Sequence, residues 1–313
     1  MAEAAPSDTT ASGWFNRTGW RSTLIATPYI WLLAFFFVPF LIVVAMSLAV
    51  SVGASPPFEF LDNWPYIRFE NFVRLFEDDL FIRAFLISIY NASIATVLCL
   101  LLGYPMALCL TRVHRSWRNI LLMLVILPFW TSFLLRVYAW IGLMGTNSWF
   151  NKGLTAAVNF VIPAEWALRS IPMTNTNFAV ILVMVYSYLP FMILPLYENL
   201  EKLDPTLNEA ALDLGSKPWE VFRDITLPLS VPGIIAGGLL VFIPASGELI
   251  IPSLVGNAAD PMIGRVISDQ FSAAHDWPMA SAVAVALLFL LVFPMMAYHH
   301  FEAKAQAREE LRR

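Results

Sequence analysis

Long apolar runs alternate with short polar segments along this chain of 313 residues. A helix needs about 20 mostly apolar residues to cross a bilayer, and six runs meet that requirement. The predicted spans cover residues 25–50, 84–110, 119–143, 177–198, 229–252 and 279–300. Polar tails flank them at residues 1–23 and 301–313. We therefore expect an all-α membrane protein whose six transmembrane helices form one domain over residues 24–300.

The amino-acid composition points to the same class of protein. Hydrophobic residues make up 58% of the chain and charged residues only 13%, whereas soluble domains carry about 25% charged residues. The net charge of −4 offers no basic surface to nucleic acid. Residues 1–20 lack a short apolar core followed by a small-residue cleavage site. The first span is therefore expected to act as an uncleaved anchor.

The distribution of lysine and arginine predicts the orientation of the spans, because cytoplasmic loops are enriched in these residues. Most of them fall in the two tails and in the segments at residues 112–118 and 202–223. Fewer fall in the remaining polar loops, and the first of those, at residues 51–83, is rich in acidic residues. Both termini and the segment at residues 204–228 are therefore expected to face the cytoplasm.

Residues 204–228 form a polar segment with clear signals for helix starts and ends. Asp204 can cap a helix with Pro205 in its first position, and Gly215 suits the turn that ends it. A second short helix, PWEVFRDI, is expected to end near Leu227, because a residue before proline avoids helical geometry. The resulting helix–turn–helix could lie in a groove on a partner protein or rest on the lipid surface.

The same segment resembles the EAA loop of ABC-importer permeases. It matches the pattern EAA-x3-G-x9-I-x-LP without departure, through residues Glu209, Ala210, Ala211, Gly215, Ile225, Leu227 and Pro228. The resemblance implies the type I ABC-importer permease fold, in which this loop forms a coupling helix that docks on an ABC ATPase dimer. ATP and Mg²⁺ would then be bound by that partner, and this chain would have no catalytic residue, cofactor or metal. No GxxxxGK[ST] phosphate-binding loop occurs in the sequence.

Residues 24–300 also resemble permeases of the putrescine/spermidine importer family. The similarity is carried by TPYIWLLAFFFVPFLIVV, by LPFWTSFLLRVYAWIGLM and by the stretch from GELIIPSLVG to residue 284. It implies import of a small cationic solute, such as putrescine or spermidine, through the bacterial inner membrane. The implied partners are a second homologous permease in a heterodimer, an extracytoplasmic solute-binding protein and membrane lipid. The binding protein would land on the loops at residues 51–83 and 253–278.

Two other functions are compatible with parts of this pattern. An ABC permease for another amino-acid-like solute could have a similar sequence. A stand-alone secondary transporter would explain six spans with interior prolines, but it would leave the EAA pattern unexplained.

Two charged side chains lie well inside the predicted spans, Arg136 and Glu248. A rise of about 1.5 Å per residue places both at similar height, in the outer third of the bilayer. They could form an ion pair that clamps two spans. Alternatively, Glu248 could lie on the solute pathway and attract an ammonium group, since ionisable residues in spans are often functional.

Three aromatic side chains, Trp130, Tyr186 and Tyr188, are predicted near mid-depth of the membrane. Aromatic faces attract ammonium ions, so these rings could line a gate for a cationic solute. The alternative is ordinary packing between helices.

Overall fold

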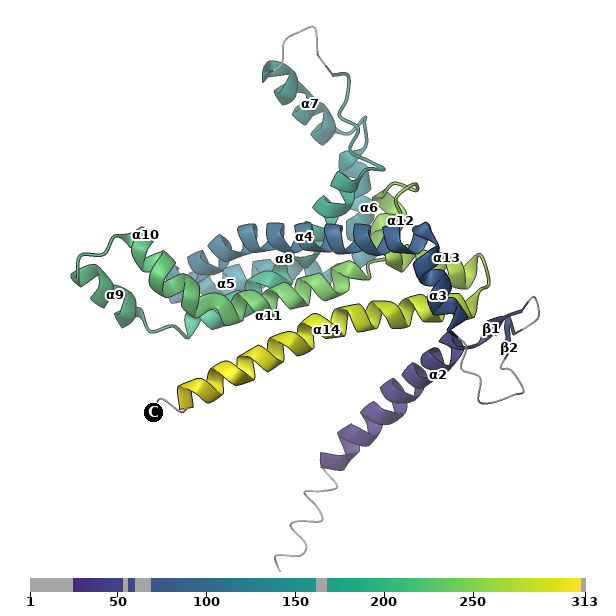
Figure 1. Ribbon diagram of the computed structural model, residues 1–313. Coiled ribbons are helices and arrows are strands. Elements are labelled where there is room, and N and C mark those ends of the chain that lie inside the picture. The colour runs from purple at the N-terminus through teal and green to yellow at the C-terminus, as the bar shows by residue number, and fades with distance from the viewer. Residues whose placement is uncertain (1–24, 53–55, 60–68, 162–167, 311–313) are drawn as a thin grey trace, which may run out of the picture.

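The computed structural model describes residues 25–52, 56–59, 69–161 and 168–310 (Figure 1). These residues form helices joined by short loops, with one small antiparallel pair of strands, β1 (Val50–Ser51) and β2 (Phe58–Glu59). The predicted N-terminal tail at residues 1–23 and parts of the predicted loop at residues 51–83 lie outside the described residues.

The helical elements follow one another without any long strand between them. In chain order they are η1 (Leu33–Phe37), α2 (Val38–Ser47), α3 (Glu70–Glu77), α4 (Asp79–Arg112), α5 (Arg115–Ile126), η2 (Leu127–Trp130), α6 (Phe133–Met144), α7 (Trp149–Val161), α8 (Asn177–Glu201), α9 (Pro205–Asp213), α10 (Pro218–Val221), η4 (Phe222–Thr226), α11 (Leu227–Ser246), α12 (Ile250–Val255), α13 (Ile263–Ser272) and α14 (Trp277–Glu310).

Four described helices are long and apolar enough to cross a membrane. They cover Ile25–Ser47, Asp79–Arg112, Asn177–Glu201 and Pro218–Ser246. A fifth crossing is possible where α5 with η2 and α6 together pass the same test. The predicted sixth span lies in α14, whose described apolar part, Trp277–Val292, is shorter than the other spanning helices. The count of six spans therefore stays a prediction.

Two predicted spans differ in shape from the expectation. The run at residues 119–143 is broken after Trp130, and the two halves meet at an angle of 91°. Pro128 lies in the 3-10 turn η2 at this break, and proline cannot donate the hydrogen bond that would continue a straight α-helix. The run at residues 229–252 is also not one helix, because α11 ends at Ser246 and α12 begins at Ile250.

The centre of the fold is a bundle of α4, α8 and α11, which lie side by side (Figure 1). Helix α8 is the most enclosed of the spanning helices. It contributes large buried side chains to the core: Val183, Met184, Met192, Ile193 and Leu196. Helix α4 faces it with small buried residues, namely Ala92, Ala95, Cys99, Gly103 and Ala107. Large side chains on one helix thus fill the space left by small ones on its neighbour.

Glycines let α11 approach α8 closely. Gly233 and Gly237 are spaced as in the small-xxx-small pattern by which membrane helices pack. A Cβ atom at Gly237 would lie 2.9 Å from Sδ of Met192 and 3.1 Å from the Met192 carbonyl oxygen. A Cβ atom at Gly233 would lie 2.7 Å from Cβ of Asn199. The backbones could not be this close with any larger residue at either position.

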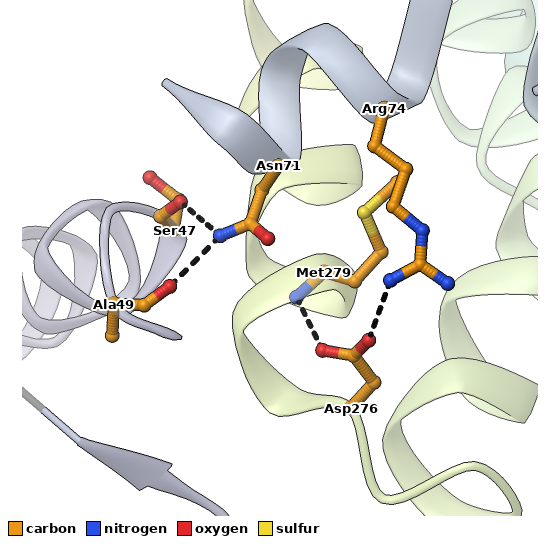
Figure 2. Close-up of polar contacts among 6 residues, drawn as sticks. All are labelled: Ser47, Ala49, Asn71, Arg74, Asp276 and Met279. Carbon is orange, nitrogen blue, oxygen red and sulfur yellow. Dashed lines mark hydrogen bonds and ion pairs between the residues drawn. The ribbon is translucent and has the colours of Figure 1, made fainter. Parts of the chain in front are cut away.

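Polar side chains of the short helix α3 contact both the end of α2 and the start of α14 (Figure 2). The Asn71 side-chain amide donates to the carbonyl oxygens of Ser47 and Ala49, both at 2.9 Å. Arg74 forms an ion pair of 3.3 Å with Asp276. The Asp276 carboxylate also accepts the backbone N–H of Met279 at 3.1 Å and so caps α14.

The close approach of α8 and α11 at the glycines can be tested with two valine substitutions, one of which serves as a matched control. Gly237→Val would place atoms against the Met192 backbone, which cannot rotate away, and overpacking of this kind costs about 1–3 kcal/mol. We expect a clear drop in the melting temperature of the purified protein. Gly238→Val adds the same atoms one position away, where the nearest atom to a Cβ is Cγ2 of Thr96 at 3.9 Å. Equal melting temperatures for the two variants would contradict the close approach.

Candidate functional site

The EAA segment (residues 204–228) begins with a capped helix, as predicted. The Asp204 carboxylate accepts the backbone N–H of Thr206 at 3.0 Å, and Pro205 occupies the first position of α9. The hydrogen bond from the Thr206 backbone lowers the pKa of Asp204 below its ordinary value. The cap therefore stays charged at neutral pH and complements the positive end of the α9 dipole.

Gly215 ends α9 in the way the sequence indicates. Its backbone adopts φ +90°, in the left-handed region. The N–H of Gly215 donates to the Leu212 carbonyl at 2.9 Å, and the N–H of Ser216 donates to the Ala211 carbonyl at 3.1 Å. These two bonds form a Schellman motif, which satisfies carbonyls that would otherwise be left open at the helix end. The turn is therefore well defined by the backbone itself.

The second helix of the segment does not end near Leu227, so that prediction is wrong. Helix α10 continues through the π turn η4 into α11 as one helix, Pro218–Ser246. The N–H of Leu227 bonds to the carbonyl of Phe222, five residues back. This wider turn lets Pro228 enter the helix, because its ring would clash with the carbonyl four residues back in a regular α-helix. The π turn η1 precedes Pro39 in the same way.

The EAA segment exposes an apolar surface. Four large apolar side chains on it face outward: Leu207, Leu212, Leu214 and Trp219. Leu214 is 88% exposed. Glu209 and Ala210 are exposed as well, whereas Ala211, Ile225 and Leu227 are half-buried and Pro228 is exposed. Several large apolar side chains exposed on one short segment are typical of a contact site for a protein or a membrane.

An aromatic contact joins the EAA segment to the bundle. The ring of Phe222 meets the ring of Tyr104 edge to face, with centroids 5.7 Å apart. The Tyr104 hydroxyl hydrogen-bonds with the Ser230 hydroxyl at 2.9 Å. Tyr104 lies in α4 and Ser230 in α11, so three elements meet here. The sequence analysis missed this group, because nothing in the spacing of these residues predicts that they are neighbours.

Glu248 lies in the break between α11 and α12 and is 8% exposed. Its Oε1 accepts the backbone N–H groups of Ile250 at 2.9 Å and Ile251 at 3.3 Å. Its Oε2 accepts a hydrogen bond from the Tyr188 hydroxyl. The carboxylate therefore caps the start of α12 and ties it to α8. All of these donors belong to the chain itself, and they occupy both carboxylate oxygens.

Arg136 makes no ion pair with Glu248 or with any other described residue. Its Nε and Nη1 atoms are buried without a hydrogen-bond partner. Its guanidinium lies over the rings of Phe129 and Phe133, at 5.7 and 5.6 Å from their centroids. Cation–π contacts recover up to about 2 kcal/mol, while removing a charge from water costs several kcal/mol. Within the described chain, the charge of Arg136 is thus only partly compensated.

The structure does not gather the three predicted gate aromatics into one cluster. Trp130 lies in η2 at the break and is 74% exposed. Tyr186 meets the ring of Trp140 edge to face at 5.4 Å, and the buried Tyr188 contacts Phe191. Among the described rings, Trp130 contacts neither tyrosine. Their role in a solute pathway stays a prediction.

Two cavities flank the bundle. An apolar cavity of about 370 Å³ lies between α4, α5 and α8, and Tyr186 forms part of its wall. A polar cavity of about 510 Å³ lies where α4 and α8 begin. Its polar lining residues are Arg83, Tyr90, Asn91, Asn175, Thr176, Asn177, Asn257 and Asp260. The sequence analysis missed this polar cavity, because its residues come from three separate segments.

The surroundings of Glu248 predict different effects for two substitutions. Glu248→Ala would leave the Tyr188 hydroxyl and two backbone N–H groups buried without partners, at about 1–3 kcal/mol each. Glu248→Gln keeps an oxygen for the backbone N–H groups, and its amide can donate to the Tyr188 oxygen. We expect a large loss of thermal stability for Glu248→Ala and a small one for Glu248→Gln, measured on purified protein. Equal stability of the two variants would rule out the capping role.

Comparisons with known proteins identify relatives along nearly the whole chain. Residues 18–306 match the family described as binding-protein-dependent transport system inner membrane component. The spermidine/putrescine transport system permease protein PotB of Haemophilus influenzae is 37% identical over 289 residues, which cover 92% of this chain and 96% of that protein. PotB of Escherichia coli is 38% identical over 275 residues, which cover 88% of this chain and 95% of that protein.

A solved structure shares the fold. A chain of a bacterial ABC transporter involved in the import of the acidic polysaccharide alginate superposes with a TM-score of 0.64. The two chains are 20% identical, and the match covers 92% of this chain and 98% of that one. The chain described here is thus a mostly helical membrane protein with the fold of an ABC-importer chain. It belongs to the family of inner-membrane components of binding-protein-dependent transport systems.

Proposed function

We propose that this chain is a transmembrane permease subunit of an ATP-driven ABC importer that moves a polyamine, such as spermidine or putrescine, into the cytoplasm. One observation carries the proposal. The chain is 37% identical to a spermidine/putrescine permease along 96% of that protein. It also has the complete EAA pattern at residues 209–228, on an exposed helical segment. The chain itself acts as a transport subunit rather than as an enzyme.

The EAA segment is the contact site for the ATPase dimer in this proposal. ATP and Mg²⁺ bind to those partner subunits, which hydrolyse the nucleotide. The exposed side chains of Leu207, Leu212, Leu214 and Trp219 supply an apolar surface for the docking. Because α10, η4 and α11 form one continuous helix, a displacement of the EAA segment is passed directly to α11. The Phe222–Tyr104 contact passes it to α4 as well.

The proposed assembly follows from the same family. Two ATPase subunits bind two permeases, and the two permeases surround one pathway. This chain is one of the permeases, and a homologous subunit is the other. The chain crosses the inner membrane six times, with both termini and the EAA segment in the cytoplasm. The opposite side, including residues 253–278, receives the solute-binding protein. The first helix, Ile25–Ser47, is barely buried by the rest of the chain, which suits contact with lipid or with the second permease.

Uptake of labelled putrescine tests both the importer class and the solute. The chain would be produced with its ATPase, second permease and binding protein in cells that lack polyamine importers. We expect ATP-dependent uptake, competed by unlabelled spermidine but not by γ-aminobutyrate or arginine. If the assembled complex hydrolyses ATP without importing a polyamine, the solute assignment is wrong, and the competitor that blocks uptake identifies the solute class.

Glu209→Lys separates an ABC permease from a stand-alone transporter. The substitution reverses a charge on the exposed α9 surface, so it should abolish uptake while the chain still reaches the membrane. Glu198→Lys, an identical change at an exposed residue of α8 outside the EAA segment and outside the two loops, serves as the control and should leave uptake near the wild-type level. Undiminished uptake with Glu209→Lys would favour a carrier that does not depend on an ATPase.

The contact between Phe222 and Tyr104 predicts a loss of coupling. Phe222→Ala removes the ring that links the EAA segment to α4, so ATP hydrolysis should continue while the uptake per ATP falls several-fold. Tyr104→Phe keeps the ring contact and loses only the hydrogen bond to Ser230, so its effect should be smaller. The ratio of uptake to ATP hydrolysis in reconstituted vesicles measures both. An unchanged ratio for Phe222→Ala would show that this contact does not transmit motion.

A further inference from the structure

The EAA segment is joined to the bundle by two unlike connections (Figure 1). On one side α10, η4 and α11 form a continuous helix, Pro218–Ser246. On the other side α8 ends at Glu201, and only Lys202 and Leu203 separate it from Asp204, the cap of α9. No helix continues through these two residues. The angle between α8 and α9 therefore depends on how firmly the end of α8 is held.

Arg118 of α5 reaches the ends of both α4 and α8. Its Nη1 donates to Oε1 of Glu201 at 2.6 Å, and its Nη2 donates to the carbonyl oxygen of Thr111 at 3.1 Å. Thr111 is the next-to-last residue of α4, and Glu201 is the last residue of α8. The side chains of Arg118 and Glu201 are 23% and 43% exposed. One guanidinium thus links three helices at the point where the EAA segment begins.

Helix dipoles explain why the guanidinium lies at this place. The last carbonyl groups of a helix have no partner within the helix, and they form the negative end of its dipole. A cation is favoured there, so the guanidinium suits the ends of both α4 and α8. The carboxylate of Glu201 is unfavourable at the same end of α8, and Arg118 compensates for it. Glu201 therefore contributes to the contact with Arg118 rather than to the stability of α8 alone.

The contact is better suited to fixing a position than to stabilising the whole fold. A partly exposed ion pair adds little to the free energy of folding. The groups that it joins nevertheless belong to three separate helices. The contact therefore limits how far the end of α8 can move away from α4 and α5.

We propose that Arg118 is a positioning residue, which holds Glu201 against the end of α4 and so keeps the α8 side of the EAA segment in place. The inference rests on the proposed coupling of this segment to an ATPase. With the contact intact, a displacement of α9 is passed to α8 and, through the guanidinium, to α4 and α5. Without it, the turn at Lys202 and Leu203 bends, and part of the displacement is lost.

Hydrogen exchange on the affinity-purified complex tests the restraint without a transport assay. Arg118→Gln and Glu201→Gln should each speed the exchange of backbone amides in α9 and in the last turn of α8 several-fold, because a less restrained segment opens more often. Arg115→Gln and Glu198→Gln change exposed residues one turn earlier on the same two helices. These two controls should exchange like the wild type. Wild-type exchange in both Arg118→Gln and Glu201→Gln would overturn the proposal.

Uptake per ATP hydrolysed, measured in reconstituted vesicles, tests the role in coupling. Arg118→Gln should lower this ratio several-fold while ATP hydrolysis continues, and Arg115→Gln should leave the ratio unchanged. A role in stability alone would lower the melting temperature of the complex and leave the ratio unchanged. That result would contradict the proposal.

Exchanging the two charges tests the pair itself. Arg118→Glu and Glu201→Arg each bring like charges together, so each alone should lower the uptake ratio more than Arg118→Gln does. The double variant restores opposite charges, and the helix dipoles favour both, because residue 118 lies near the start of α5 and residue 201 at the end of α8. Recovery of part of the ratio in the double variant is the expected result.

The absence of any recovery in the double variant would also overturn the proposal. A different result would refute only the proposed function. If the wild-type complex hydrolyses ATP without importing a polyamine, the solute assignment is wrong, whereas the hydrogen-exchange comparison still decides whether Arg118 holds the EAA segment.

Discussion

The close approach of α11 to α8 is the contact on which the rest of the structure depends. Gly233 and Gly237 bring the two backbones together, and Met192 fills the space between α8, α4 and α11. Packing of this kind needs no hydrophobic driving force, which lipid would not provide, because it relies on van der Waals contact between closely fitted helices. The contact between α8 and α11 also fixes the position of two hydrogen-bonded pairs of side chains. These pairs are Tyr104 with Ser230 and Tyr188 with Glu248.

The proposed coupling of the EAA segment to the bundle depends on the same contact between α8 and α11. The EAA segment is not joined to α11 by a flexible loop, because η4 continues the helix past Pro228. A π turn is wider than a regular helical turn, so it accommodates the proline without ending the helix. With Phe222 placed against Tyr104, the proposed coupling would run from the EAA segment into the bundle through both α11 and α4.

Several surfaces of the chain remain exposed, as expected for a subunit rather than for a complete transporter. The first helix, the outer side of α6 and the EAA segment all expose large apolar side chains. Lipid can cover some of these surfaces. The apolar side chains of the EAA segment and the guanidinium of Arg136 lie on different elements of the chain.

The sequence by itself determined the mostly helical membrane class, the approximate position of each apolar run and both ends of α9. These features depend on local chemistry: apolar length, a capping aspartate and a glycine with positive φ. Only the tertiary structure decided the break after Trp130, the end of α11 at Ser246 and the partners of Glu248 and Arg136. Tyr188 lies 60 residues from Glu248, and hydrophobic periodicity contains no information about which helices become neighbours. Pairing across such distances depends on how side-chain volumes fit between helices, and that is set by all the helices together.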